Sequence, residues 1–216
     1  MTAAGQRAES GVGGFKLKIT NIKKEGSTIS FEVSGINASI ANALRRAVIS
    51  KVPTLAIEDV RFYDNSSILN DEILAHRLGL IPLNADLDTY KLQKDCKCKG
   101  KGCSTCTATL TLDVKGPGTV YAEKLKSKGN AVAPVYKKTP ITKLTDKQAI
   151  KLEAVAVLGA GKDHIKWQPG IASYEEEGGS FKFFVESYGQ MSAEELLKRA
   201  FETVGEDIAE LKKALK

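Results

Sequence analysis

The sequence NALRRAVISKVPTLAIEDVRFYDNSSILNDEILAHRLGLIPL, residues 42–83, carries the most structural information in the chain. Its apolar residues recur at helical spacing as far as Pro53, which disfavours helical geometry at the residue before it. The run IEDVRFYDNSS then reads as a strand and a turn. A short helix capped by Asp71 follows and runs to Gly79, with Pro82 beyond its end. The stretch therefore predicts a helix, a strand and a second helix in succession.

The first of these helices has a defined start and one apolar face. Asn37 or Ser39 can cap it, and its apolar stripe consists of Ile40, Leu44, Ala47 and Val48. Arg45 and Arg46 lie off that stripe. They either face solvent or anchor a carboxylate of a partner chain.

Strands are expected on either side of this stretch. Residues 15–34 predict a hairpin, because apolar residues alternate with polar ones on both of its arms: Phe15, Leu17, Ile19, Ile29, Phe31 and Val33. TATLTLDV, residues 107–114, predicts an amphipathic strand, and the GPG turn at 116–118 leads to TVYAEKL as its partner strand. Residues 126–134 read as a loop.

The second half of the chain continues this mixed pattern. Thr145 and Gln148 have the spacing of a capping box, so TDKQAIKL predicts a short helix. A buried strand follows, and a glycine-punctuated connection carries Trp167, the only tryptophan. SFKFFVESYG then predicts a strand with Phe181, Phe183 and Val185 facing inward.

The C-terminal segment predicts a long amphipathic helix. Ser192 and Glu195 form a capping box, and the helix extends toward Lys216. Its apolar residues are spaced 4, 3, 4, 3 and 4 apart, as in a coiled-coil seam: Leu197, Phe201, Val204, Ile208, Leu211 and Leu215. A helix of about 24 residues spans about 36 Å, which is more than a compact core of this size needs. We therefore expect a second chain to pack along part of this seam.

All four cysteines fall within DCKCKGKGCSTC, residues 95–106: Cys96, Cys98, Cys103 and Cys106. Gly100 and Gly102 separate the two pairs and permit positive φ, so four thiolates can surround one ion. Zn²⁺ is the leading candidate, as a structural ion, because four sulfurs leave no open position for water. An iron–sulfur cluster fits less well, since Thr107 rather than proline follows Cys106. A metal-free dithiol is the third alternative.

Composition describes an ordinary globular protein with a mildly basic surface. The 216 residues are 42% hydrophobic and 27% charged, with a formal net charge of +6. No apolar run approaches the ~20 residues of a membrane span, so no membrane role is expected. The first 14 residues lack the apolar core of a secretory signal and read as a disordered tail, which indicates a cytoplasmic protein with reduced thiols. The charge fits a nucleic acid, an acidic partner or simple solvation.

Residues 42–83 and the segment PITKLTDKQAIKLEAVAVLGAGKDHIKWQPG, residues 140–170, resemble the alpha-type assembly subunits of DNA-directed RNA polymerase. Within that family, a cysteine loop after the IPL segment resembles the archaeal D-type chain and the third-largest subunit of eukaryotic RNA polymerase II. The resemblance implies an α+β fold in two parts. A discontinuous dimerisation domain of residues 15–51 and 175–216 holds a sheet and two helices, and residues 52–174 form an inserted, mainly β domain with the metal loop 95–106.

The resemblance also implies partners. The first domain would pair with a small alpha-like chain, the L subunit in archaea, and the pair would carry small subunits N and P and the two large catalytic subunits. DNA would be met only indirectly. The implied pairing residues are Leu44, Val48, Leu197, Phe201, Val204, Ile208 and Leu211, and the implied contacts with other subunits are Arg45, Arg46, Glu72 and Arg77.

Two features depart from the family pattern. The ferredoxin-like domain with an iron–sulfur cluster that many archaeal D-type chains carry has no counterpart in length or cysteines here. The four residues between the cysteine pairs are also slightly more than in the eukaryotic loop.

Three functions remain as hypotheses. A non-catalytic assembly subunit agrees with the lack of a nucleophile–base pair, a phosphate-binding glycine loop or a carboxylate cluster in the sequence. A free-standing zinc-bearing nucleic-acid binder would show strongly salt-dependent affinity for DNA. A thiol oxidoreductase would use Cys103 and Cys106 without metal.

Overall fold

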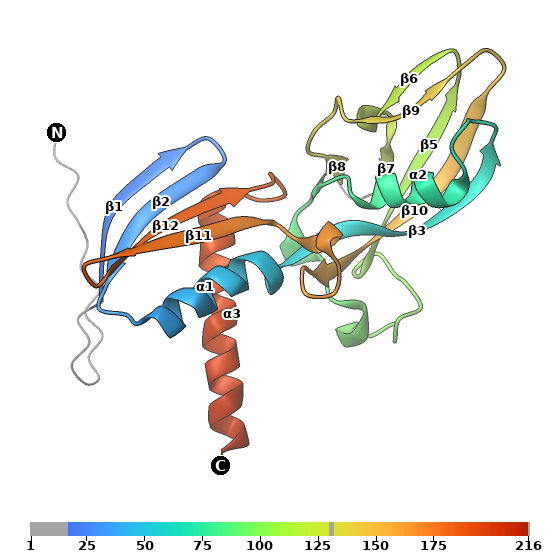
Figure 1. The fold of residues 1–216 in the computed structure, drawn as a ribbon. Helices are drawn as coiled ribbons and strands as arrows, with labels where there is room; N and C mark the ends of the chain where they lie inside the picture. The colour runs from blue at the N-terminus through green and yellow to red at the C-terminus, as the bar shows by residue number, and fades with distance from the viewer. Residues whose placement is uncertain (1–16, 130–131, 216) are drawn as a thin grey trace.

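The computed structural model describes residues 17–129 and 132–215, in which two four-stranded sheets form the centres of two separate parts (Figure 1). The expected tail and Phe15 lie outside the described residues. The architecture is α+β, as the sequence predicts: the described part is mainly antiparallel sheet, with three α-helices of eight residues or more.

The first sheet joins the two ends of the chain. Its order is β1-β2-β12-β11, all antiparallel, with bounds Lys18–Glu25, Thr28–Ser34, Ser180–Ser187 and Gly170–Glu177. Phe31 lies directly opposite Phe183, and their rings stack with centroids 5.1 Å apart. The inward alternation expected for β2 and β12 is confirmed, because every apolar residue predicted to face inward on these two strands is buried.

Two helices cover one face of this sheet. Helix α1, Ala38–Ser50, packs against β11 and against α3, Ala193–Ala214. Asn37 and Ser192 are the N-caps, and their side chains accept hydrogen bonds from the amides of Ile40 and Glu195. The stripe predicted for α1 was wrong at one position: Ala41 is buried in place of Ile40, which is 52% exposed.

Strand β1 is more exposed than the hairpin pattern predicts. Ile19 and Ile22 are 43% and 56% exposed, so the strand is not half-buried within this chain. It forms an edge of the sheet, and its pairing with β2 is irregular between Thr20 and Lys23, where Asn21 adopts a φ of 55°. The two helices of this chain leave its apolar residues largely uncovered.

The second sheet lies in the middle of the sequence and has the order β3-β10-β5-β7. The strands are Pro53–Asn65, Ala149–Ala160, Thr107–Lys115 and Lys126–Lys128. Helix α2, Asp71–Gly79, packs against β3 and β9. The N-cap of α2 is Asn70 rather than the predicted Asp71, because the Asn70 side chain accepts a hydrogen bond from the amide of Ile73.

Two small sheets also belong to this part. One pairs β4, Leu83–Asn84, with β8, Ala133–Pro134, and the other pairs β6, Gly118–Tyr121, with β9, Pro140–Leu144. Four single-turn 3-10 helices complete this part: η1, Leu87–Thr89; η2, Gln93–Asp95; η3, Ala122–Lys124; and η4, Ile165–Trp167.

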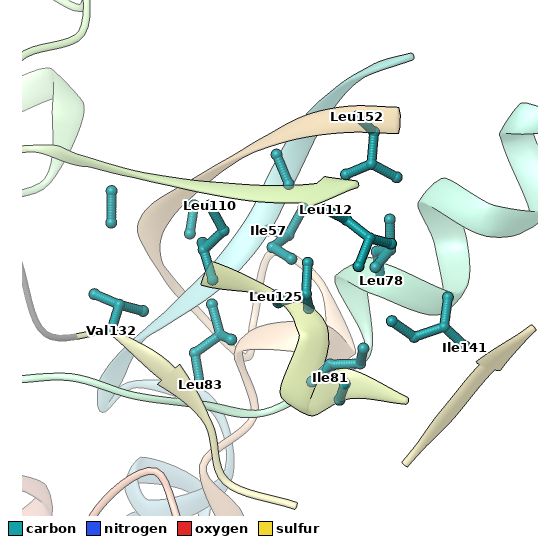
Figure 2. Close-up of a cluster of buried hydrophobic side chains, with 14 of the residues drawn as sticks. Ile57, Leu78, Ile81, Leu83, Leu110, Leu112, Leu125, Val132, Ile141 and Leu152 are labelled. Atoms are coloured by element: carbon teal, nitrogen blue, oxygen red, sulfur yellow. The ribbon is translucent and has the colours of Figure 1, made fainter. Parts of the chain in front are cut away.

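The core of this second part is aliphatic and collects side chains from sheet, helix and loops. Figure 2 shows Leu110 and Leu112 of β5 beside Ile57 of β3 and Leu78 of α2, and loop residues close the cluster from the other side. All four of these side chains are at most 1% exposed. The part therefore has a hydrophobic core of its own, distinct from the one between the first sheet and its helices.

The structure changes the predicted pairing after residue 115. TVYAEKL does not pair with β5; its strand β6 pairs with β9, and β5 pairs with β10 and β7. At Gly116 the backbone passes close to the turn just before β10, and the Gly116 amide donates a hydrogen bond to Gln148 O at 2.8 Å. A Cβ at Gly116 would lie 2.2 Å from Thr145 O, so only glycine permits this close passage.

The short helix predicted from Thr145 is also wrong. Gln148 does reach back to the Thr145 amide at 2.7 Å, as in a capping box, but it closes a turn between β9 and β10. From Ala149 onward the alternating buried residues of β10 form ladders with β3 and β5, and these long-range contacts override the local signal.

The chain passes between the two parts twice, before β3 and after η4. β11 begins at Gly170 and belongs to the first sheet, so the expected boundary at residue 175 falls inside a strand of that sheet. Trp167, the last residue of η4, lies at the second of these connections and is held there by two hydrogen bonds. Its indole donates to Val157 O at 3.1 Å, and its carbonyl accepts from Thr54 Oγ1 at 2.8 Å.

Candidate functional site: the cysteine loop and the C-terminal helix

The four cysteine sulfurs lie together at the start of β5. All four Sγ atoms are within 4.8 Å of one another, with 3.5 Å from Cys96 to Cys103 and from Cys98 to Cys106. Cys96 and Cys106 are buried, and Cys98 and Cys103 are partly exposed. The loop lies at the end of the second sheet away from β6 and β9 (Figure 1).

Tight turns of the backbone bring the sulfurs together. Lys99 N donates to Cys96 O at 3.0 Å, and Thr107 N donates to Cys103 O at 2.9 Å. The backbone is left-handed at Lys99, Gly100 and Gly102, with φ of 54°, 79° and 83°. The predicted use of the two glycines for positive φ is thereby confirmed.

The donor set fits a four-coordinate metal ion. Zinc–thiolate bonds of about 2.3 Å in a tetrahedron place neighbouring sulfurs about 3.8 Å apart, close to the 3.5 and 3.6 Å separations in this loop. The amide of Cys103 donates to Cys106 Sγ at 3.3 Å, which stabilises a thiolate. The cluster can therefore hold a metal ion with little rearrangement.

Thr105, which was not among the predicted site residues, supports two of the sulfurs. Its Oγ1 lies 3.0 Å from Cys103 Sγ and 3.6 Å from Cys96 Sγ. The amide of Cys98 and then the Thr105 hydroxyl lower the pKa of Cys96 to about 6, and the same hydroxyl lowers the pKa of Cys103. Burial raises the pKa of Cys106 to about 12. A hydroxyl two residues after one cysteine and one before the next is the sequence signal for such a donor.

Helix α3 presents the second candidate site, an exposed apolar row. Figure 1 shows its C-terminal half projecting beyond both sheets. Phe201, Ile208 and Leu211 are 45%, 51% and 61% exposed, while Leu197 and Val204 pack partly against the first core. The residues of α3 that this chain buries are Ala193, Leu196 and Ala200, on a neighbouring face. The predicted seam is therefore largely uncovered by the chain itself.

The comparisons with known proteins decide the family. The sequence model of the RNA polymerase Rpb3/RpoA insert domain matches residues 60–172, more than half of the chain. DNA-directed RNA polymerase subunit Rpo3 of Methanocaldococcus jannaschii is 48% identical over 169 residues, which cover 75% of this chain and 77% of that protein. This chain belongs to the Rpo3 family of RNA polymerase subunits.

Other family members align over a smaller share of their length. Rpo3 of Pyrococcus furiosus is 42% identical over 159 residues, which are 74% of this chain and 59% of that protein. Rpo3 of Pyrobaculum aerophilum is 46% identical over 144 residues, covering 66% of this chain and 55% of that protein. The chain thus spans less than two thirds of the length of several relatives.

Within this family fold, two of the expected pairing residues are internal. Leu44 and Val48 of α1 are 4% and 0% exposed, in the core beneath the first sheet. They position α1 against its own chain. Ile19 and Ile22 of β1, which were not among the predicted pairing residues, offer exposed apolar surface at the edge of the same sheet. An edge strand is often covered by a partner chain, so its apolar residues need not be buried by their own chain, and this reasoning would have identified Ile19 and Ile22 from the sequence.

The four charged residues expected at subunit contacts divide into two kinds. Arg77 donates to the carbonyls of Ile141 and Pro140, both at 2.8 Å, and so ties α2 to β9. Arg45 donates to Asn42 Oδ1 within α1. The side chains of Arg46 and Glu72 are exposed.

No helix in residues 17–129 or 132–215 has both the length and the apolar character needed to cross a membrane.

Proposed function

We propose that this chain is a non-catalytic assembly subunit of DNA-dependent RNA polymerase. It pairs with a small alpha-like subunit, equivalent to L, and the pair forms the platform for the two large catalytic subunits and for small subunits N and P. Family membership supports this role, since the relatives described above are named as subunits of DNA-directed RNA polymerase. Such a complex works in the cytoplasm, and this chain meets DNA chiefly through its partners.

The exposed row on α3 is the single observation that carries the pairing. Three large apolar side chains at coiled-coil spacing are each more than 40% exposed on a helix that extends beyond its own core. Exposed apolar groups in such a row are typical of an interface. Ile19 and Ile22 of β1 are a second set of exposed apolar residues, at the edge of the sheet, and we expect the partner to contact them as well.

The cysteine loop has a structural role in this proposal. It holds one Zn²⁺ through Cys96, Cys98, Cys103 and Cys106, and the ion orders a polar loop that has few apolar side chains to pack. A redox role for Cys103 and Cys106 is less well supported, because all four thiols converge on one point.

A single substitution on α3 tests the pairing. Replacing Ile208 by Asp places a charge in the centre of the proposed interface, where burial without a partner is costly. We expect the tagged I208D chain to recover less than about a tenth of the small alpha-like subunit that the unchanged chain recovers at moderate salt. Mass spectrometry of the co-purified proteins measures this.

Ala209 provides the matched control. It is exposed one residue further along α3 and faces away from the apolar row, so A209D introduces the same charge on the same helix. We expect A209D to co-purify with the polymerase subunits at normal stoichiometry. Normal stoichiometry for I208D as well would show that this face of α3 is not the interface.

A further inference from the structure

Residues 91–106, which are the cysteine loop and the four residues before it, carry more positive charge than the negative charge of a zinc–thiolate site would balance. Residues 91–106 hold five lysines, Lys91, Lys94, Lys97, Lys99 and Lys101, and one acidic residue, Asp95. A zinc ion with four thiolates has a net charge of about −2. Asp95 and the metal site together leave an excess of about two positive charges, concentrated in one short loop.

The ammonium groups of these lysines are available to a partner. All five residues are exposed. Within the described part of the chain none of them forms an ion pair, whereas Lys24, Lys51 and Lys128 each pair with a carboxylate. Isolated lysines scattered over a surface need no explanation, but five unpaired ones within eleven consecutive residues do.

The backbone holds this charge in a defined arrangement. Lys97, Lys99 and Lys101 alternate with Cys96, Cys98 and two glycines, so three of the charges sit on the turns that the sulfurs close. Lys91 N donates to Thr105 O at 2.8 Å, which joins the two ends of the segment, and Lys101 N donates to Cys98 O at 3.2 Å, which closes a turn in its middle. A fixed arrangement lowers the entropy cost of binding several charges at once.

The chemistry of the loop favours a polyanion over a protein surface. Residues 91–106 contain no aromatic residue and no arginine, and Leu92 is their only large aliphatic residue. Protein interfaces are enriched in aromatic residues and arginine and depleted in lysine. Contacts with a nucleic-acid backbone depend on lysine and arginine charges that release counterions from phosphates.

We propose that the lysines of the cysteine loop bind the phosphate backbone of nucleic acid, without reading its sequence. This contact is additional to the assembly role and does not depend on α3. The metal ion orders the turns, and the lysines then present their charges together.

Two triple variants of the zinc-loaded full chain test the proposal. K97Q/K99Q/K101Q removes three charges from the loop, and K137Q/K138Q/K143Q removes three exposed charges from the β6–β9 end. The probe is a fluorescent duplex DNA of mixed sequence, and anisotropy gives the affinity between about 50 and 200 mM salt. We expect the loop variant to bind at least about ten-fold more weakly at low salt, with a log–log salt slope reduced by about 2 to 3. The control variant should change affinity by less than about two-fold.

Other outcomes would overturn the proposal. Equal losses in both variants would mean that the overall charge, not the loop, attracts DNA. Unchanged DNA binding by the loop variant, together with loss of a polymerase subunit on co-purification, would identify the loop as a contact for an acidic protein. Circular dichroism checks that both variants are folded.

Discussion

At the residue scale, a glycine can be required because neighbouring atoms leave no room for a side chain. Gly159 of β10 lies directly beneath the indole of Trp167, and a Cβ there would be 2.4 Å from the ring carbons Cδ2 and Cε2. The same ring is held by its hydrogen bond to Val157 O, so it has little freedom to retreat. The glycine therefore permits the close packing that seals the second crossing between the two parts.

Substituting this glycine should be costly. We expect G159A to lower the free energy of unfolding by about 1–3 kcal/mol, because the methyl group displaces Trp167. Urea unfolding followed by tryptophan fluorescence measures this loss, and far-ultraviolet circular dichroism, which also reports on α3, measures the control variant G205A. In G205A the new methyl group meets no atom within 4 Å on the exposed surface of α3, and it should add about 0.5–1 kcal/mol through helix propensity. Equal effects of the two variants would contradict the packing argument.

Sequence reasoning at the residue scale succeeded where a residue's chemistry has few uses. Four cysteines in twelve residues predicted a single cluster, and their sulfurs do converge. The roles of Arg45 and Arg77 were harder to predict, because an arginine donates equally well to its own chain or to another. Only the fold brings Arg77 to the carbonyls of β9, 63 and 64 residues further along the chain.

At the scale of elements, the cysteine loop depends on a metal more than on packing. Its residues between the cysteines are lysines, glycines and hydroxyl residues, which contribute almost no buried apolar surface. Strand β5 continues directly from Cys106, and its alternating Ala108, Leu110 and Leu112 are buried in the second core. The loop should therefore lose order without metal while the strand keeps it.

Limited digestion with trypsin tests this difference. The purified chain should contain about one zinc ion, and its loop should resist cleavage at Lys97, Lys99 and Lys101. After chelation we expect cleavage at these lysines to become at least about ten-fold faster, because metal binding supplies the folding energy of the loop. Cleavage at Lys137 and Lys138 serves as the internal control and should not change. Equal rates with and without metal would mean that the loop folds without an ion.

The elements also show where local patterns mislead. The alternation of β2 and β12 predicted both strands because local pattern and burial agree. The capping box at Thr145 predicted a helix that does not exist, since the same side-chain to backbone bond also closes a turn. The pairing of β6 with β9 could not be predicted from local sequence, because about twenty residues separate the two strands.

The whole molecule consists of two cores joined by few contacts. The first lies between sheet β1-β2-β12-β11 and its helices, and the second lies within the β3-β10-β5-β7 part. Besides the two chain crossings, the salt bridge from Arg199 of α3 to Asp88 joins the parts, Gly189 packs closely against Val135, and Met191 packs partly against both cores. An exposed salt bridge contributes about 1 kcal/mol or less, so the coupling between the two parts is weak.

We therefore expect the two parts to unfold in separable steps. In urea, Trp167 fluorescence reports on the second part, because the indole packs against Ala56 and Val157. Far-ultraviolet circular dichroism reports on both parts, including α3. L110A removes a fully buried side chain from the second core and should cost about 2–5 kcal/mol there. It should lower the fluorescence midpoint and leave the other dichroism step in place.

F183A makes the reciprocal change in the first core, where Phe183 stacks on Phe31. It should destabilise that core by about 3–5 kcal/mol and lower the dichroism step while leaving the fluorescence midpoint unchanged. If each variant moved both probes together, the two cores would form one cooperative unit, and the junction at Arg199 and Met191 would be stronger than its contacts indicate. Separable unfolding would instead fit an assembly subunit whose two parts hold different neighbours, since each part could then adjust to its own partner without strain on the other.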